Sequence, residues 1–169
     1  MTYQAALTWW LTGSGKTTLA LALSERQRSE GETVCILDGD VLRAGVCADL
    51  GFSEADCERN VTRVSHLAQL LNAQGLHAVV AQVSLAAPAR AAARSIVGAA
   101  AFREIYLSAP LAVCEARDPK GLYARSRNGQ LANMTGLQAG YDAPLAPHAS
   151  IDSSQHSVAD SVAALLRLR

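Results

Sequence analysis

The chain has 169 residues, half of them hydrophobic, and its formal net charge is zero. This predicts one domain with a substantial core, and without a basic field we expect no nucleic-acid partner. No apolar run approaches the ~20 residues of a membrane span, and the N-terminal residues lack the pattern of a signal peptide, so no membrane partner is expected. The four cysteines are scattered without a C-x-x-C pair, which favours a reducing, cytoplasmic setting over a zinc site or a disulfide framework.

In the first half of the chain, short apolar runs alternate with longer helical ones. In order, the pattern predicts a strand at 6–12, a helix at 15–31, a strand at 33–40, a helix at 53–75 and a strand at 77–85. Ser53 is the expected N-cap of the long helix, and Gly31 and Gly75 are the expected helix stops.

The second half continues the alternation around one polar segment. In order, the pattern predicts a helix at 88–100, a strand at 102–110, a short helix at 111–118, a weaker strand at 149–154 and a closing helix at 157–169. Residues 118–147 are polar and rich in Gly and Pro, which predicts a loop or lid. The whole chain, 1–169, therefore reads as a single α/β domain, a parallel sheet of about five strands with helices on both faces.

The segment "GSGKTT" lies between a predicted buried strand and a predicted helix, the context of a phosphate-binding loop. It comprises Gly13, Ser14, Gly15, Lys16, Thr17 and Thr18. Backbone N–H groups at a helix N-terminus attract phosphate, Lys16 can reach the β- and γ-phosphates, and the Thr17 hydroxyl can bind Mg²⁺. The alternative, an ordinary glycine-rich turn with a surface lysine, is disfavoured by the strand–turn–helix context. The segment predicts that ATP and Mg²⁺ bind here.

This loop is too short for the full pattern G-x-x-x-x-G-K-[ST]. The opening glycine would fall at position 10, which is Trp10. Two interpretations stay open: a true deletion, which leaves little backbone to wrap the β-phosphate, or a sequence that lacks a short stretch of the natural chain. The intact Lys16–Thr17 pair favours a missing stretch or local disorder over a dead site.

The segment "LDGD" places two carboxylates, Asp38 and Asp40, at the carboxyl end of a predicted strand, where ligands of open α/β sheets bind. One carboxylate can hold a Mg²⁺-bound water, and the other can accept a proton from an attacking hydroxyl. The alternative is a plain Asp-Gly turn, which would be preferred if no phosphate loop lay beside it.

Three segments together resemble the adenylylsulfate kinase family: "LDGDVLRAGVCADLGFSEAD", "CEARDPKGLYARSRNGQ" and "MTGLQAGY". The resemblance covers nearly the whole chain. It implies a P-loop kinase fold with a lid, Mg-ATP as phosphoryl donor, and sulfate assimilation as the setting. The implied acceptor is the 3′-hydroxyl of adenosine 5′-phosphosulfate. The family's W-x-T-G-L-S-G-S-G-K-T matches "WLTGSGKT" if three residues are absent beside Gly13.

The resemblance also implies residue roles. Asp40 would lie nearest the acceptor hydroxyl, Asp38 would face the metal with Thr17, and Arg117 would lie against the ATP adenine. The residues implied on the acceptor side are Arg43, Phe52, Asn60, Lys120, Leu122 and Met134. Ser84 matches a serine that the family sometimes treats as a phosphoserine intermediate. Direct in-line transfer needs no protein nucleophile, so a strand-end hydrogen-bonding role is an equal alternative.

The departures from the family pattern gather on the acceptor side. Cys57, Ala86, Ala87 and Met134 stand where the family has arginines and aromatic residues. The same chemistry on another acceptor nucleotide, such as cytidine diphosphoramidate, is therefore an alternative function. An alternative of another class is a catalytically dead nucleotide-binding or scaffold protein. The expected partner is a small-molecule nucleotide, and a homodimer is left open.

Overall fold

The computed structural model describes residues 5–9, 11–84, 86–130 and 141–168. Its sheet consists of β1 (Ala5–Trp9), β2 (Val34–Asp38), β3 (His77–Ala81), β4 (Phe102–Leu107) and β5 (Ala149–Ile151). The strand order is β2-β3-β1-β4-β5, and every neighbouring pair is parallel. In the described part of the chain, the predicted parallel sheet of about five strands is confirmed.

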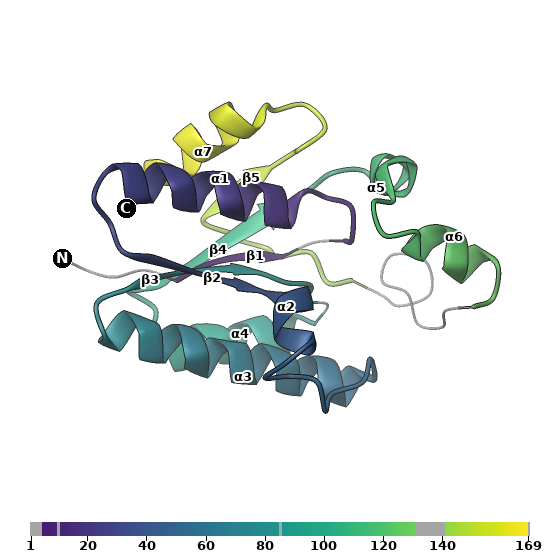
Figure 1. Ribbon diagram of the computed structural model, residues 1–169, viewed down its shortest axis with the longest axis horizontal. Helices are drawn as coiled ribbons and strands as arrows, with labels where there is room; N and C mark the ends of the chain where they lie inside the picture. The colour runs from purple at the N-terminus through teal and green to yellow at the C-terminus, as the bar shows by residue number, and fades with distance from the viewer. Residues whose placement is uncertain (1–4, 10, 85, 131–140, 169) are drawn as a thin grey trace.

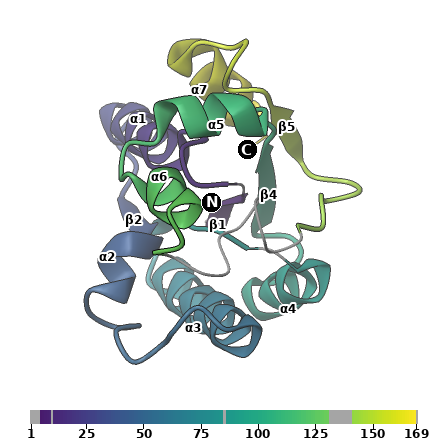
Figure 2. The ribbon, with the colours of Figure 1, turned by 90° about the vertical axis from the view of Figure 1, so that its right-hand side faces the viewer.

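The helices form two layers on the sheet and a small group beyond one end of its strands (Figure 1). They are α1 (Lys16–Ser29), α2 (Gly39–Arg43), α3 (Glu54–Ala73), α4 (Ala87–Val97), α5 (Leu111–Arg117), α6 (Leu122–Arg127) and α7 (Val158–Leu166). Helices α1 and α7 cover one face, whereas α3 and α4 cover the other. Figure 2 looks onto the end of the sheet where α5 and α6 lie, beside the N-terminal end of α1.

Two short helices were not predicted from the sequence. The strand expected at 33–40 ends at Asp38, because the Asp38 side chain accepts a hydrogen bond from the Asp40 N–H at 2.9 Å and so caps α2. Helix α6 lies inside the segment expected to be loop. The Asp118 carboxylate accepts hydrogen bonds from the N–H groups of Tyr123 and Ala124, at 3.2 and 3.1 Å, and holds its first turn. The remainder of the expected lid is only partly within the described residues.

The predicted boundaries of the long helix are confirmed. The Ser53 hydroxyl accepts a hydrogen bond from the Asp56 N–H at 3.1 Å, as an N-cap does. Gly75 follows the end of α3 with a φ of +81°, a conformation that favours glycine. Gly31 follows the end of α1 in the same way, with a φ of +87°.

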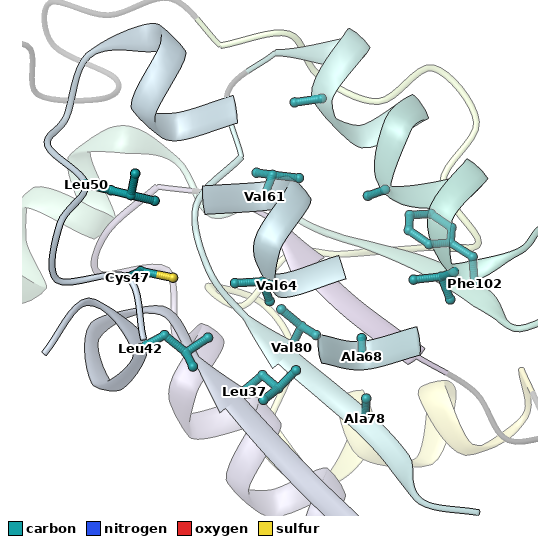
Figure 3. Close-up of a cluster of buried hydrophobic side chains, with 13 residues drawn as sticks. Leu37, Leu42, Cys47, Leu50, Val61, Val64, Ala68, Ala78, Val80 and Phe102 are labelled. Carbon is teal, nitrogen blue, oxygen red and sulfur yellow. The ribbon is translucent and has the colours of Figure 1, made fainter. Parts of the chain in front are cut away.

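Buried side chains fill both sides of the sheet. Val80 points into the cluster shown in Figure 3, with Val61 and Val64 of α3, whereas its neighbour Val79 packs with Leu23 and other residues under α1 and α7. Such opposite burial of adjacent residues is typical of a parallel strand covered on both faces. Among the residues described here, no helix is long and apolar enough to cross a membrane.

Candidate active site

The predicted phosphate loop leads directly into α1. Gly13 and Gly15 have φ angles of +81° and +91°, and Gly15 is the N-cap of the helix. A Cβ on Gly13 would lie only 2.6 Å from the Cys114 carbonyl oxygen, so this position excludes any side chain. The first N–H groups of a helix have no partner within it, so the start of α1 offers hydrogen-bond donors to an anion.

The Lys16 side chain folds back over this loop. Its Nζ donates to the Leu11 carbonyl oxygen at 2.6 Å and lies 3.4 Å from the Ser14 hydroxyl. Burial lowers the pKa of Lys16 to about 8, and the positive charge of Lys120 adds to this effect, whereas Cys114, Asp40 and Asp38 oppose it. The lysine therefore lies within electrostatic reach of both predicted carboxylates.

A direct hydrogen bond joins the phosphate loop to the "LDGD" segment. The Thr17 hydroxyl donates to Asp38 Oδ2 at 2.7 Å, while Asp38 Oδ1 accepts from the Asp40 N–H. The position between the two aspartates requires glycine, because a Cβ on Gly39 would lie only 2.9 Å from Cβ of Gln82. Mg²⁺ is usually held by one or two protein oxygens together with substrate phosphates, so Thr17 and Asp38 form a suitable donor pair.

Asp40, the predicted proton acceptor, is paired with a cation from the lid. Lys120 Nζ forms an ion pair with Asp40 Oδ2, and both side chains are in contact with solvent. Lys120 lies between α5 and α6, so this contact brings the predicted lid to the acceptor end of "LDGD". The structure therefore brings together two residues that were predicted separately, Lys120 on the lid and Asp40 in "LDGD".

Arg117, predicted beside the adenine, lies at the end of α5 against the phosphate loop. Its Nη1 donates to the Gly13 carbonyl at 3.4 Å and to the Ser153 hydroxyl at 3.1 Å, and its Nη2 donates to the Ser153 carbonyl at 2.8 Å. Thr18 lies on the exposed first turn of α1. No described contact tests the adenine role of Arg117.

Two predicted acceptor residues form a surface platform. Phe52 is 68% exposed, and the Arg43 guanidinium carbon lies 4.4 Å from its ring centroid. Arg43 also donates to the carbonyl oxygens of Leu50 and Gly51, at 3.1 and 2.8 Å, which fixes its position. Half-buried Cys57 lies near Arg43, and its pKa is raised by burial, so the thiol is protonated at neutral pH and is a poor nucleophile.

Asn60 and Ser84 lie deeper than the surface platform. Asn60 is 4% exposed, and its Nδ2 donates to Gln82 Oε1 at 3.2 Å. Ser84 is 2% exposed, and its hydroxyl has no hydrogen-bond partner among the described residues. A serine buried in this way is poorly placed to be a phosphorylated intermediate.

Leu122 has a packing environment, and two further predicted positions lie outside the described residues. Leu122 packs against the buried cluster of Leu11, Ala109, Cys114 and Tyr123 beside the phosphate loop. Met134 and Trp10 fall outside the described residues.

Sequence reasoning missed several residues that support the site. Ser153 donates to the Ser14 carbonyl at 2.7 Å, and the Tyr123 hydroxyl donates to the Thr12 carbonyl at 2.9 Å. Tyr123 stands within "DPKGLY", a part of the segments that resemble the family, but the resemblance assigned this residue no role. Ser153 stands in a polar stretch with no distinguishing pattern, and only the fold brings it to the loop.

Comparisons with known proteins find relatives over nearly the whole chain. The family model described as Adenylylsulphate kinase matches residues 5–152. The adenylyl-sulfate kinase of Paraburkholderia xenovorans (strain LB400) is 46% identical over 165 residues, covering 96% of this chain and 92% of that protein. The adenylyl-sulfate kinase of Citrobacter koseri is 42% identical over 168 residues, covering 98% and 83%, respectively.

Solved structures give the same result. The chain is similar to the APS kinase CysC of Mycobacterium tuberculosis in complex with AMPPNP and APS, with a TM-score of 0.94 and 36% identity, covering 99% of this chain and 97% of that chain. A gluconokinase from Sinorhizobium meliloti shares only the fold, with a TM-score of 0.61 and 15% identity over 99% and 93% of the two chains.

Proposed function

Because the chain belongs to the adenylyl-sulfate kinase family, we propose that it transfers the γ-phosphoryl group of ATP to the 3′-hydroxyl of adenylyl sulfate. The observation that carries this proposal is the hydrogen bond from Thr17 to Asp38 at 2.7 Å. It links the phosphate loop to the segment that holds Asp40, so donor and acceptor machinery lie within one side chain's reach.

On the donor side, the N–H groups at the start of α1 and the Lys16 ammonium hold the β- and γ-phosphates of ATP. Thr17 and Asp38 would hold Mg²⁺, which, when bound, would neutralise charge on the phosphates. The short loop supplies fewer N–H groups than the full pattern, so Lys16 and the helix start carry a larger share of phosphate binding.

On the acceptor side, Asp40 takes the proton of the 3′-hydroxyl as the hydroxyl oxygen forms its bond to the γ-phosphorus and the bond to the ADP oxygen breaks. In-line transfer of this kind needs no covalent enzyme intermediate, so Ser84 has no nucleophilic role. Lys120 pairs with Asp40 before the acceptor enters. Once the hydroxyl takes that place, the ammonium of Lys120 is free to meet phosphate charge.

An acceptor screen with ADP release as the readout tests this function. Adenylyl sulfate is expected to give the highest kcat/KM among 3′-hydroxyl nucleotides, cytidine diphosphoramidate included. Asp40→Asn is expected to lower kcat by roughly 10²–10⁴-fold at saturating substrates, the usual size of general-base catalysis. A preference for the cytidine compound would identify a changed acceptor. No ADP release with any nucleotide would identify a dead protein.

The setting and the assembly are further parts of this proposal. All four cysteines are free thiols, which supports a reducing, cytoplasmic environment. A hexameric APS kinase from Thiobacillus denitrificans is 26% identical with a TM-score of 0.70, although the chain spans only 29% of that protein's chain. A homodimer is our proposal for this chain, and sedimentation of the purified protein tests it.

A further inference from the structure

Four successive carbonyl groups, from the two residues before the phosphate loop and its first two residues, each accept a side-chain hydrogen bond. Lys16 Nζ donates to Leu11 at 2.6 Å, and the Tyr123 hydroxyl donates to Thr12 at 2.9 Å. The next two donors are Arg117 Nη1, at 3.4 Å from the Gly13 oxygen, and the Ser153 hydroxyl, at 2.7 Å from the Ser14 oxygen. Three of the four donors come from outside the loop and α1, on segments more than 100 residues away.

Ser153 has the most connected position of these donors. It follows β5, and 139 residues separate it from Ser14. Its hydroxyl accepts from Arg117 Nη1 at 3.1 Å while donating to Ser14, and its carbonyl accepts from Arg117 Nη2. A Cβ built on Gly15 would lie 4.0 Å from this hydroxyl, so Ser153 packs directly against the end of the loop.

The hydrogen bond to the Ser14 carbonyl also fixes the direction of the Gly15 N–H group. The peptide bond is planar and trans, so the Ser14 C=O and the Gly15 N–H point in opposite directions. Holding the oxygen toward Ser153 therefore turns the Gly15 N–H to the other side of the loop. Gly15 lacks a Cβ and has a φ of +91°, so its backbone has the freedom to rotate when this hold is lost.

We propose that Ser153 is a positioning residue for ATP, acting through the Ser14–Gly15 peptide of the phosphate loop. The proposal rests on the proposed function, since it requires the loop to bind the phosphates of ATP. In a loop shorter than the full pattern, fewer N–H groups remain to contact phosphate, so the orientation of each one matters more to affinity.

Three variants test this role. Ser153→Ala removes the hydroxyl, Ser153→Thr retains one, and Ser154→Ala is the matched control, because the Ser154 hydroxyl donates to Asp152 Oδ1 at 2.6 Å. The KM for Mg-ATP and the Kd of a non-hydrolysable ATP analogue are measured together with the KM for adenylyl sulfate and the melting temperature. Ser153→Ala is expected to raise both ATP constants about fivefold to tenfold, in line with one lost hydrogen bond, and to leave the acceptor KM unchanged. Ser153→Thr is expected to restore wild-type ATP constants, and Ser154→Ala to keep them.

Each other outcome overturns the proposal. Equal ATP constants for Ser153→Ala and Ser154→Ala would remove Ser153 from ATP positioning. A lower melting temperature with unchanged ATP constants would show a structural role only. If the wild-type protein itself fails to bind the ATP analogue, the proposed function and this inference both fail. Normal wild-type binding with an unaffected Ser153→Ala refutes this inference alone.

Discussion

At the scale of single residues, Lys16 makes nucleotide binding sensitive to pH. Burial lowers its pKa from 10.5 to about 8, so in the free protein the ammonium loses its proton as the pH rises through that value. Bound phosphate favours the charged form, and binding above pH 8 must then take up a proton. We expect the affinity for a non-hydrolysable ATP analogue to fall by about tenfold between pH 7 and pH 9.

Calorimetry in two buffers of different ionisation enthalpy checks this proton uptake directly. The prediction is a proton uptake that grows from near zero at pH 7 toward one per nucleotide at pH 9. Affinity and proton count that stay constant across this range would show that Lys16 keeps its charge, contrary to the effect of its burial.

We propose two separable functions for Asp38, one for each of its oxygens. Oδ1 caps α2 through the Asp40 N–H, whereas Oδ2 accepts from Thr17 and faces the proposed metal. Asparagine caps a helix as well as aspartate does, so Asp38→Asn is expected to keep the melting temperature while raising the Mg²⁺ requirement about 10–100-fold. Asp38→Ala is expected to lose about 0.5–2 kcal/mol of unfolding free energy as well. A stable Asp38→Asn enzyme with an unchanged Mg²⁺ dependence would contradict the metal role.

Some residues of the site could be predicted from the sequence, and others could not. Lys16, Thr17 and Asp38 could be predicted as site residues because each stands in a motif whose chemistry requires that residue type. Ser153 and Gln82 could not, because a serine in a polar loop and a glutamine after a strand carry no local signal. Their roles come from contacts with Ser14 and Asn60, which are remote in sequence.

At the scale of elements, the junction between the phosphate loop and α5 depends on a missing side chain. Gly13 has a φ of +81°, and a Cβ there would meet the Cys114 carbonyl at 2.6 Å. Gly13→Ala is therefore expected to lower the unfolding free energy by at least about 1–2 kcal/mol, the cost of the left-handed conformation alone, and to weaken ATP binding.

Gly45→Ala provides the matched control for this substitution. No heavy atom lies within 4 Å of a Cβ built on Gly45, and the residue lies in a turn after α2. Its unfolding free energy is expected to stay within about 0.5 kcal/mol of wild type. Denaturant unfolding followed by circular dichroism compares the two variants, and equal effects would contradict the left-handed, closely packed backbone at Gly13.

Hydrophobic periodicity was strong enough to predict amphipathic helices such as α3 and α4. Helix α3 has a serine cap and a glycine stop, and both were legible in the sequence. Helices α2 and α6 have only five and six residues, too few to show a period. Each is held instead by a single aspartate, Asp38 or Asp118, whose carboxylate binds backbone N–H groups of the first turn. Such side-chain caps are common at turns as well, so the sequence alone favoured a strand end and a loop.

At the scale of the whole molecule, the fold followed from alternation and burial. Neighbours such as Val79 and Val80, both nearly inaccessible, require a sheet covered on two faces. What the pattern could not give was the effect of a short phosphate loop on the site. In the fold, side chains from α1, α5, α6 and the segment after β5 donate hydrogen bonds to the carbonyl groups in and before this loop. These neighbouring elements therefore stabilise a loop that is too short to stabilise itself.

Phosphoryl transfer itself is the most direct test of the central claim, that this chain with its short phosphate loop is an active adenylyl-sulfate kinase. Wild-type protein is incubated with Mg²⁺, γ-labelled ATP and adenylyl sulfate, and the nucleotide product is identified by mass and by the position of the label. We expect label on the 3′-hydroxyl of adenylyl sulfate, and none with Lys16→Ala, which removes the ammonium from the loop. Unlabelled adenylyl sulfate after prolonged incubation with folded wild-type protein, or equal labelling by Lys16→Ala, would contradict the account.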